Sequence, residues 1–228
     1  AMLKHDKGQV IIPTGGGKTI CMIQDYLGHE YRGCNTTVVV APRILLAKQL
    51  CKEFLELLPK DYLVHVMHVH SGDTEFFSTT KARQIQLFNN TARAAGESCI
   101  IFTTYHSLEK IVQSGIDVDT IYFDEAHNSV QRNFFVPTEF YSRYARRCYF
   151  FTATPKHSVT PRKPGMNDSR VYGQVICNVP APKLVEQGYI LPPVVRLTQL
   201  PQGDFKQSDS KNLIDTIDDN TASKILIA

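Results

Sequence analysis

The sequence predicts an α/β fold in which a parallel β-sheet is covered by helices on both faces. Short runs of β-branched and aromatic residues alternate with longer stretches of helical period along most of the 228 residues. The short runs are apolar at consecutive positions, as strands buried on both faces of a parallel sheet are. The composition is that of an ordinary soluble protein, and the length favours one large domain over two small ones.

The expected strands and helices alternate in chain order. Strands are expected at 9–13, 36–41, 62–69, 98–104, 120–125 and 147–154. Helices are expected at about 17–29, 43–58, 80–95 and 104–114. The second helix carries apolar residues at spacings of three and four, which indicates an amphipathic helix: Leu46, Leu50, Phe54 and Leu57.

The pattern changes after the sixth expected strand. Residues 156–170 are rich in Pro, Ser and basic residues without a clear period, so a mobile loop is expected there. A strand at 171–179, a short helix at 182–187 and a strand at 191–200 follow. We expect these last elements to add a hairpin or an edge strand to the same sheet.

Composition and charge exclude several classes of function. No run approaches the roughly 18 to 20 apolar residues of a membrane helix, and the N-terminus lacks the apolar stretch of a secretory signal. We therefore expect a cytoplasmic or nuclear protein that is not secreted, and we leave out Ala1, which resembles the remnant of an expression tag. A net charge of +3 is too small to indicate nucleic-acid binding by itself.

The cysteines and histidines favour structural roles. Six cysteines are scattered without a CxxC pair, as expected for reduced, buried thiols rather than a metal site. His65, His68 and His70 alternate with valines, which favours a strand at a sheet edge over a cluster of metal ligands.

The stretch PTGGGKT lies between the first expected strand and the first expected helix. In that position glycines let backbone N–H groups and a helix N-terminus surround phosphates, which side chains would block. Lys18 would then reach the β and γ phosphates, and the Thr19 hydroxyl would bind Mg²⁺. The generic pattern GxxxxGK[ST] fails at Ile12, so a simple glycine turn stays as the alternative. The predicted phosphate-binding residues are Pro13, Thr14, Gly15, Gly16, Gly17, Lys18 and Thr19.

The second motif is FDEAH, at the end of the apolar run of residues 121–123. A carboxylate at the tip of a neighbouring strand is placed to hold Mg²⁺ through water, and the next carboxylate can polarise an attacking water. We assign the metal-side role to Asp124 and the general base to Glu125. Paired acids usually mark a solvated turn, but their position at a strand end in the same α/β alternation favours the catalytic interpretation.

With PTGGGKT, FDEAH and the TAT of residues 152–154 in this order, the chain resembles the first RecA-like domain of superfamily 2 helicases and translocases. The resemblance is close over residues 8–155. Residues 172–195 are similar to a segment of DNA-directed members, including helicase subunits of restriction enzymes and excision-repair helicases. This favours DNA over RNA as the partner, with no element that would read bases.

The resemblance implies ATP as the substrate, Mg²⁺ as the cofactor and ATP-driven translocation or strand separation as the activity. It assigns coupling of the nucleotide state to movement to three residues, His127, Thr152 and Thr154. Segments 38–50 and 102–108 resemble the motifs that contact the nucleic-acid backbone in this family. The implied contacts are Pro42, Arg43, Thr103 and Thr104, with Lys48, Arg162 and Lys163 as further basic candidates.

The expected domain spans residues 2–200, and residues 201–228 are expected to be a linker and the first strand of a truncated second RecA-like domain. Half of such a motor would bind nucleotide but hydrolyse it weakly, because the catalytic arginines lie in the second domain. No glutamine motif for adenine recognition is evident, which leaves the base preference open. The alternatives are an RNA helicase, a P-loop kinase, and a binding module with a vestigial nucleotide site.

Overall fold

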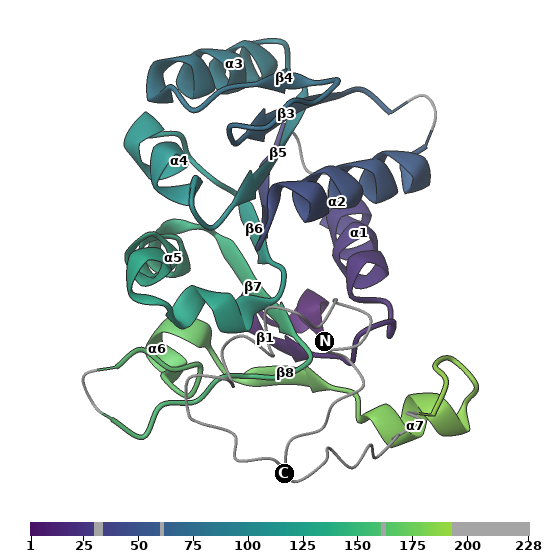
Figure 1. Ribbon diagram of the computed structural model, residues 1–228. Coiled ribbons are helices and arrows are strands. Elements are labelled where there is room, and N and C mark those ends of the chain that lie inside the picture. Colours follow the sequence, from purple (N-terminus) through teal and green to yellow (C-terminus); the bar gives the residue numbers. More distant parts are fainter. Residues whose placement is uncertain (30–33, 60–61, 161–162, 193–228) are drawn as a thin grey trace, which may run out of the picture.

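The computed structural model describes residues 1–29, 34–59, 62–160 and 163–192. Within these residues the chain forms an eight-stranded sheet in the order β4-β3-β5-β2-β6-β7-β1-β8, with parallel pairing throughout (Figure 1). Helices cover both faces of the sheet, so the expected α/β class is confirmed.

The elements have the following bounds. The strands are β1 (Lys7–Ile11), β2 (Thr36–Ala41), β3 (Val64–Val69), β4 (Phe77–Ser78), β5 (Ser98–Thr104), β6 (Thr120–Phe123), β7 (Arg147–Thr152) and β8 (Val175–Asn178). The α-helices are α1 (Lys18–His29), α2 (Ile44–Leu57), α3 (Ala82–Ala94), α4 (Leu108–Ser114), α5 (Arg132–Tyr144), α6 (Ser169–Tyr172) and α7 (Ala181–Glu186). The described residues also include the 3-10 helices η1 (Met2–Lys4) and η3 (Ala126–Val130).

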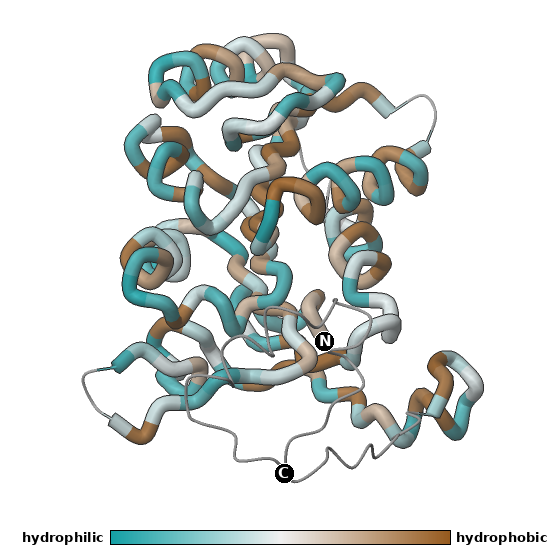
Figure 2. The backbone as a smooth tube through the Cα atoms, in the orientation of Figure 1, coloured by the Kyte–Doolittle hydropathy of each residue, from teal (hydrophilic) through white to brown (hydrophobic). Residues whose placement is uncertain are grey.

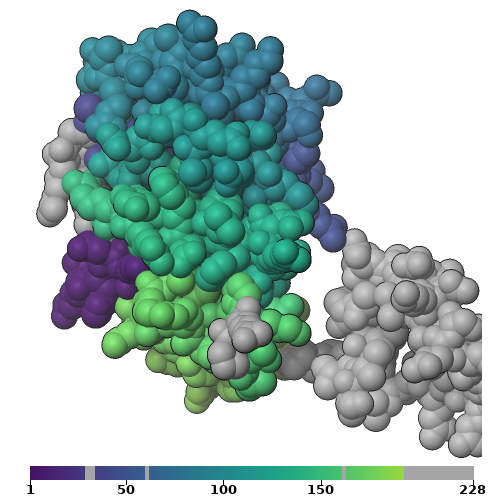
Figure 3. All heavy atoms as spheres, turned by 90° about the vertical axis from the view of Figure 1, so that its left-hand side faces the viewer, coloured from purple at the N-terminus to yellow at the C-terminus, as the bar shows by residue number. Residues whose placement is uncertain are grey.

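Alternate residues of the central strands pack into two hydrophobic clusters, one on each face of the sheet. In β2, Val38 and Val40 belong to the cluster that includes α3, α4 and α5, whereas Val39 and Ala41 belong to the cluster that includes α1 and α2. Figure 1 shows these helices on opposite sides of the sheet, and Figure 3 shows α3, α4 and α5 as a continuous layer. This two-sided burial explains why the strand sequences are apolar at consecutive positions.

The amphipathic pattern of α2 is largely confirmed. Hydrophobic and hydrophilic residues alternate along its turns in Figure 2, and Leu50 and Phe54 are buried. Leu57, at the end of the helix, is 51% exposed, so the expected apolar stripe stops one turn earlier.

Helix α5 is not expected from the sequence pattern. Its sequence is rich in aromatic residues of modest helix propensity and carries Pro137 inside the helix. The helix forms because Phe134, Pro137 and Tyr141 recur at helical spacing and are buried. Tertiary packing therefore outweighs the local propensity.

The expected strand at 171–179 is wrong in its first part. Asp168 caps the single turn α6 by accepting a hydrogen bond from the Arg170 amide, and Gly173 separates this turn from β8. β8 is a parallel edge strand beside β1, so an edge is confirmed. The expected strand at 191–200 lies almost entirely outside the described residues, as does the expected start of a second domain at 201–228.

The loop between β7 and α6 is tied to the sheet. Met166 is fully buried, and its carbonyl oxygen accepts a hydrogen bond from Gln9 Nε2 at 2.9 Å. Gln9, in β1, also donates to the Gly173 carbonyl at 3.2 Å. This glutamine therefore serves the packing of the loop.

A buried ion pair fixes α1 to the sheet. Arg147 Nη2 in β7 lies 2.6 and 2.7 Å from the two carboxylate oxygens of Asp25 in α1. The Tyr122 hydroxyl in β6 donates to the same carboxylate at 2.6 Å. The helix that follows the glycine-rich loop is thus held against the two strands that end in FDEAH and TAT.

The six cysteines are free. Burial is as expected for Cys51, Cys99 and Cys148, whereas Cys21, Cys34 and Cys177 are only partly buried. The part of the chain that the structure describes contains no group of three or more His, Cys, Asp or Glu suited to a metal ion. In the same residues no helix has the length and apolarity to cross a membrane.

Candidate nucleotide-binding site

The glycine-rich loop connects the end of β1 to the start of α1 at the carboxyl edge of the sheet. Gly15 and Gly17 have φ values of +77° and +89°, a conformation that residues with a side chain rarely adopt. The Gly16 amide donates to the Pro13 carbonyl at 3.0 Å and closes the turn. α1 begins at Lys18, so the positive end of the helix lies directly behind the loop.

Gly16 is also required by packing beneath the loop. A Cβ atom there would lie 2.6 Å from Ile12 Cγ2 and 2.9 Å from Leu184 Cδ1. Ile12, which interrupts the generic pattern, is buried and supports the loop instead. The role of Leu184 of α7 could not be predicted, because one apolar residue in a short helix gives no sign of a distant contact.

Lys18 joins the two motifs. Its Nζ lies 3.2 Å from Glu125 Oε1, and the two side chains are 10% and 25% exposed. In the sheet, β7 lies between β1 and β6, so the two motifs are not on neighbouring strands as expected. The long lysine side chain bridges that gap.

Asp124 is held at the tip of β6 by its backbone. Its amide donates to the Val40 carbonyl at 2.8 Å, and its carbonyl accepts from the Tyr105 hydroxyl at 2.8 Å. Burial raises the pKa of the Asp124 carboxyl from 3.8 to about 6, and the charge of Glu125 adds to the rise while Lys18 opposes it. The site therefore favours a cation close to Asp124.

Glu125 has a φ of +45°, the only positive φ outside glycine in the described residues. The Asn128 side chain donates to the Glu125 carbonyl at 2.9 Å and supports this conformation. The strained turn brings the side chain back toward Lys18. Backbone strain of this kind is concentrated at functional sites.

The residues predicted for coupling form one connected group. His127 Nδ1 lies 3.0 Å from Thr152 Oγ1 and 3.4 Å from Glu125 Oε2. The Thr154 amide donates to Thr152 Oγ1 at 3.1 Å. A continuous set of contacts thus runs from the FDEAH turn to the TAT turn.

The four predicted nucleic-acid contacts differ in exposure. Arg43 is exposed and Pro42 half-buried at the turn before α2, whereas Thr103 and Thr104 are buried at the end of β5. Thr103 Oγ1 donates to the Val69 carbonyl at 2.9 Å. Both threonine side chains are therefore buried in the protein interior and are not accessible to a nucleic acid. Of the further basic candidates, Arg162 lies outside the described residues.

Asp124→Asn is expected to raise the free energy of unfolding at pH 7.5 without Mg²⁺, by up to about 3 kcal/mol. The folded-state pKa of about 6 exceeds the usual 3.8, so the proton on Asp124 stabilises the fold fully below pH 3.8. This stabilisation is lost as the pH rises through 6 and Asp124 gives up its proton. Asparagine stays neutral, so the variant does not lose stability in this way. Thermal unfolding of the wild type and the variant at pH 5 and 7.5 measures the difference in stability. A difference that does not grow between these two pH values would contradict the prediction.

Comparisons with known proteins agree with this geometry. The family model for the res subunit of type III restriction enzymes matches residues 2–157. No curated protein matches the chain. At identities under 25%, the similar solved structures show a common fold.

Three solved structures are similar. A nuclease-deletion mutant of the Type ISP restriction-modification enzyme LlaGI, in complex with a DNA substrate mimic, has a TM-score of 0.65 and 22% identity over 82% of this chain and 19% of its own. The ATP-dependent Type ISP enzyme LlaBIII, bound to DNA, has a TM-score of 0.65 and 19% identity over 82% and 15% of the chains. The Pyrococcus furiosus Hef helicase domain has a TM-score of 0.54 and 20% identity over 79% and 37%.

The chain therefore spans well under half of the length of each of these proteins. Its parallel sheet, the glycine-rich loop before α1 and the FDEAH turn after β6 agree with the match to the family model. The chain belongs to the family of type III restriction enzyme res subunits, and its fold is that of the first RecA-like domain of superfamily 2 helicases.

Proposed function

We propose that this chain is the ATP-binding half of a motor that uses ATP and Mg²⁺ to translocate along DNA or to unwind it. The observation that carries the proposal is the 3.2 Å ion pair between Lys18 and Glu125. It brings a phosphate-binding lysine and a catalytic carboxylate together at a helix N-terminus. We further propose that residues 2–200 form this domain and that a second RecA-like domain follows it.

The residues present fit a nucleoside triphosphate with Mg²⁺. The backbone N–H groups of residues 15–19 would cradle the phosphates, because the loop turns through Gly15 and Gly17 in conformations that glycine alone adopts readily. Thr19 and Asp124 would hold Mg²⁺, which neutralises charge on the phosphates when it is bound. The raised pKa of Asp124 fits this role, because a buried carboxylate without a cation favours its proton.

Glu125 would orient the attacking water and accept its proton. Lys18 would leave Glu125 for the phosphates when nucleotide binds, which frees the carboxylate for this task. Through His127 and Thr152, the state of Glu125 would be passed to the TAT turn and from there toward the second domain.

DNA is the proposed partner for two reasons. Residues 172–195 are similar to DNA-directed members of the superfamily, and LlaGI and LlaBIII, which share the fold, are described as bound to a DNA substrate mimic and to DNA. Contacts from Pro42 and Arg43 would be to the phosphate backbone and would not depend on base sequence. Thr103 and Thr104 would contribute only through their backbone.

The test is hydrolysis by a protein that extends this chain through the second RecA-like domain. ATP turnover is expected to rise when single- or double-stranded DNA is added and to rise less with RNA of the same length. ATP turnover that changes with neither nucleic acid would contradict the proposal. Transfer of phosphate to a small acceptor would also contradict it and would favour a kinase. A stronger response to RNA would favour an RNA helicase.

A further inference from the structure

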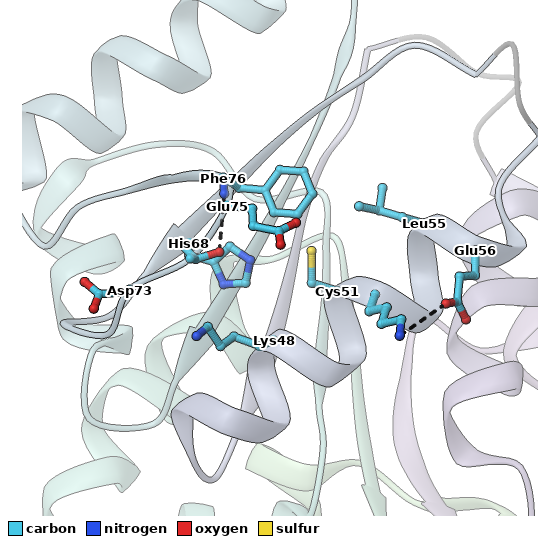
Figure 4. Close-up of a pocket in the computed structure, with 10 residues that line it drawn as sticks. Lys48, Cys51, Leu55, Glu56, His68, Asp73, Glu75 and Phe76 are labelled. Atoms are coloured by element: carbon cyan, nitrogen blue, oxygen red, sulfur yellow. Dashed lines mark hydrogen bonds and ion pairs between the residues drawn. The ribbon is translucent and has the colours of Figure 1, made fainter.

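A second hollow lies away from the nucleotide site, between α2, β3 and the turn of residues 70–76. This pocket has a volume of about 780 Å³, within the range of small-ligand sites. Figure 4 shows Lys48, Cys51 and Leu55 of α2 on one side, with His68 and Phe76 on the other. None of the residues assigned to ATP or Mg²⁺ lines this pocket.

His68 presents an unpaired donor at this pocket. The Gly72 amide donates to His70 Nδ1 at 3.2 Å, so the neutral His70 ring carries its proton on Nε2. That proton is donated to His68 Nδ1 at 2.9 Å, which leaves the His68 proton on Nε2. His68 is 1% exposed, and its Nε2 has no hydrogen-bond partner within the described residues. A buried donor of this kind calls for an acceptor.

The pocket also contains an incomplete aromatic stack. The His68 ring lies between Phe102 and Phe76, with ring centroids 5.6 and 6.0 Å apart and interplanar angles of 28° and 25°. Phe102 is buried in the core, whereas Phe76 is 37% exposed. The 6.0 Å centroid distance means that Phe76 overlaps His68 only in part, so a planar ring that enters the pocket beside His68 can stack on the same face of Phe76.

The charges around the pocket favour a nucleobase over a phosphate group. Lys48 and Lys52 stand beside three carboxylates, those of Glu56, Asp73 and Glu75. Lys52 lies 3.8 Å from Glu56, so part of its charge is compensated. Carboxylates would repel an anion, but they accept hydrogen bonds from the amino groups of bases, while the His68 N–H suits a ring or carbonyl acceptor.

The pocket adjoins the proposed DNA-backbone contacts. α2 begins at Ile44 directly after Arg43, and Lys48 lies one turn further along the same helix. The turn after β3 packs on the start of α2, because a Cβ on Gly72 would lie 2.8 Å from Ile44 Cγ2. A strand whose phosphates contact Arg43 could therefore place a base between Lys48 and Phe76.

We propose that this pocket receives one unstacked base of a single nucleic-acid strand. The base stacks on Phe76 beside the His68 ring and, as the partly exposed Phe76 side chain moves to admit it, accepts a hydrogen bond from the buried His68 Nε2. The inference rests on the proposed function and adds to it a contact with the bases, where the resemblance implies backbone contacts alone. Sequence preference would be weak, because every base offers a flat face and an acceptor.

The experiment uses the 228-residue chain and a short fluorescent single strand of deoxycytidines, with an abasic strand of equal length as the second ligand. Phe76→Ala is expected to weaken binding of the base-bearing strand roughly 5- to 150-fold. Binding of the abasic strand is expected to be equal for the wild type and the variant. Fluorescence anisotropy gives both affinities.

Phe77→Ala is the matched control. Phe77 is the next residue and is 45% exposed, but it stacks on Phe88 at 5.1 Å and does not line the pocket. It is expected to bind both strands as the wild type does. Equal losses in Phe76→Ala and Phe77→Ala, or an undiminished preference for bases in Phe76→Ala, would overturn the inference while the proposed function stands. A wild-type chain that binds neither strand would instead contradict the proposed function and this inference with it.

Discussion

Lys18→Ala is expected to weaken nucleotide binding by this chain about 150- to 5,000-fold. The Lys18 side chain is 10% exposed, and removing one partner of a largely buried, hydrogen-bonded charge pair costs about 3–5 kcal/mol. The phosphates would lose their only lysine in the loop, and Glu125 would be left facing them without a cation. Titration with a fluorescent ATP analogue in the presence of Mg²⁺ measures the loss.

The substitution acts on Asp124 as well. Lys18 lowers the pKa of that carboxyl against the effect of burial, so its removal should raise the pKa above the present value of about 6. The residual binding of Lys18→Ala should therefore depend on pH near neutrality more steeply than that of the wild type. Lys110→Ala, at an exposed position on α4, is the control and should bind nucleotide normally. Unchanged binding in Lys18→Ala would refute the assignment of the loop.

The sequence predicts the architecture well because burial on two faces leaves a strong pattern. Strands such as β2 and β5 are buried at every position and have consecutive apolar residues at their centres, so their order along the chain could be read directly. Helix α5 could not be found in this way, because Pro137 disfavours a helix locally. The helix is stabilised instead by the packing of Phe134 and Tyr141 in the core. The position of β7 between β1 and β6 is likewise a property of the assembled sheet.

For the candidate site, the sequence predicts which residues take part but not which of them contact one another. The motifs place Lys18 and Glu125 at strand ends, and only the structure gives the ion pair that joins them. Leu184 beneath the loop and Tyr105 behind Asp124 act over long sequence separations, which no local pattern encodes. The alternation of His68 with valine predicted the strand β3 correctly, but the expected position at the sheet edge is wrong, because β4 lies outside β3. The pattern also gave no sign of the unpaired donor on His68.

Glu125→Gln is expected to separate hydrolysis from binding. Loss of a general base lowers the rate about 10²- to 10⁴-fold, because the amide cannot accept a proton from water. Nucleotide affinity should be retained or raised, since Lys18 no longer has to leave an ion pair of 3.2 Å before it contacts the phosphates. Phosphate release by the protein with both RecA-like domains, with DNA present, gives the rate, and the fluorescent titration of this chain gives the affinity.

Two outcomes would contradict this assignment in different ways. Hydrolysis that survives in Glu125→Gln would mean that another group activates water, whereas loss of binding together with hydrolysis would make Glu125 a support of the loop. Glu109→Gln, at an exposed site on α4, controls for the change of charge and should alter neither measurement. Because Lys18→Ala is expected to lose binding and Glu125→Gln to keep it, the two variants together distinguish a catalytic pair from a structural salt bridge, in which both changes would act alike.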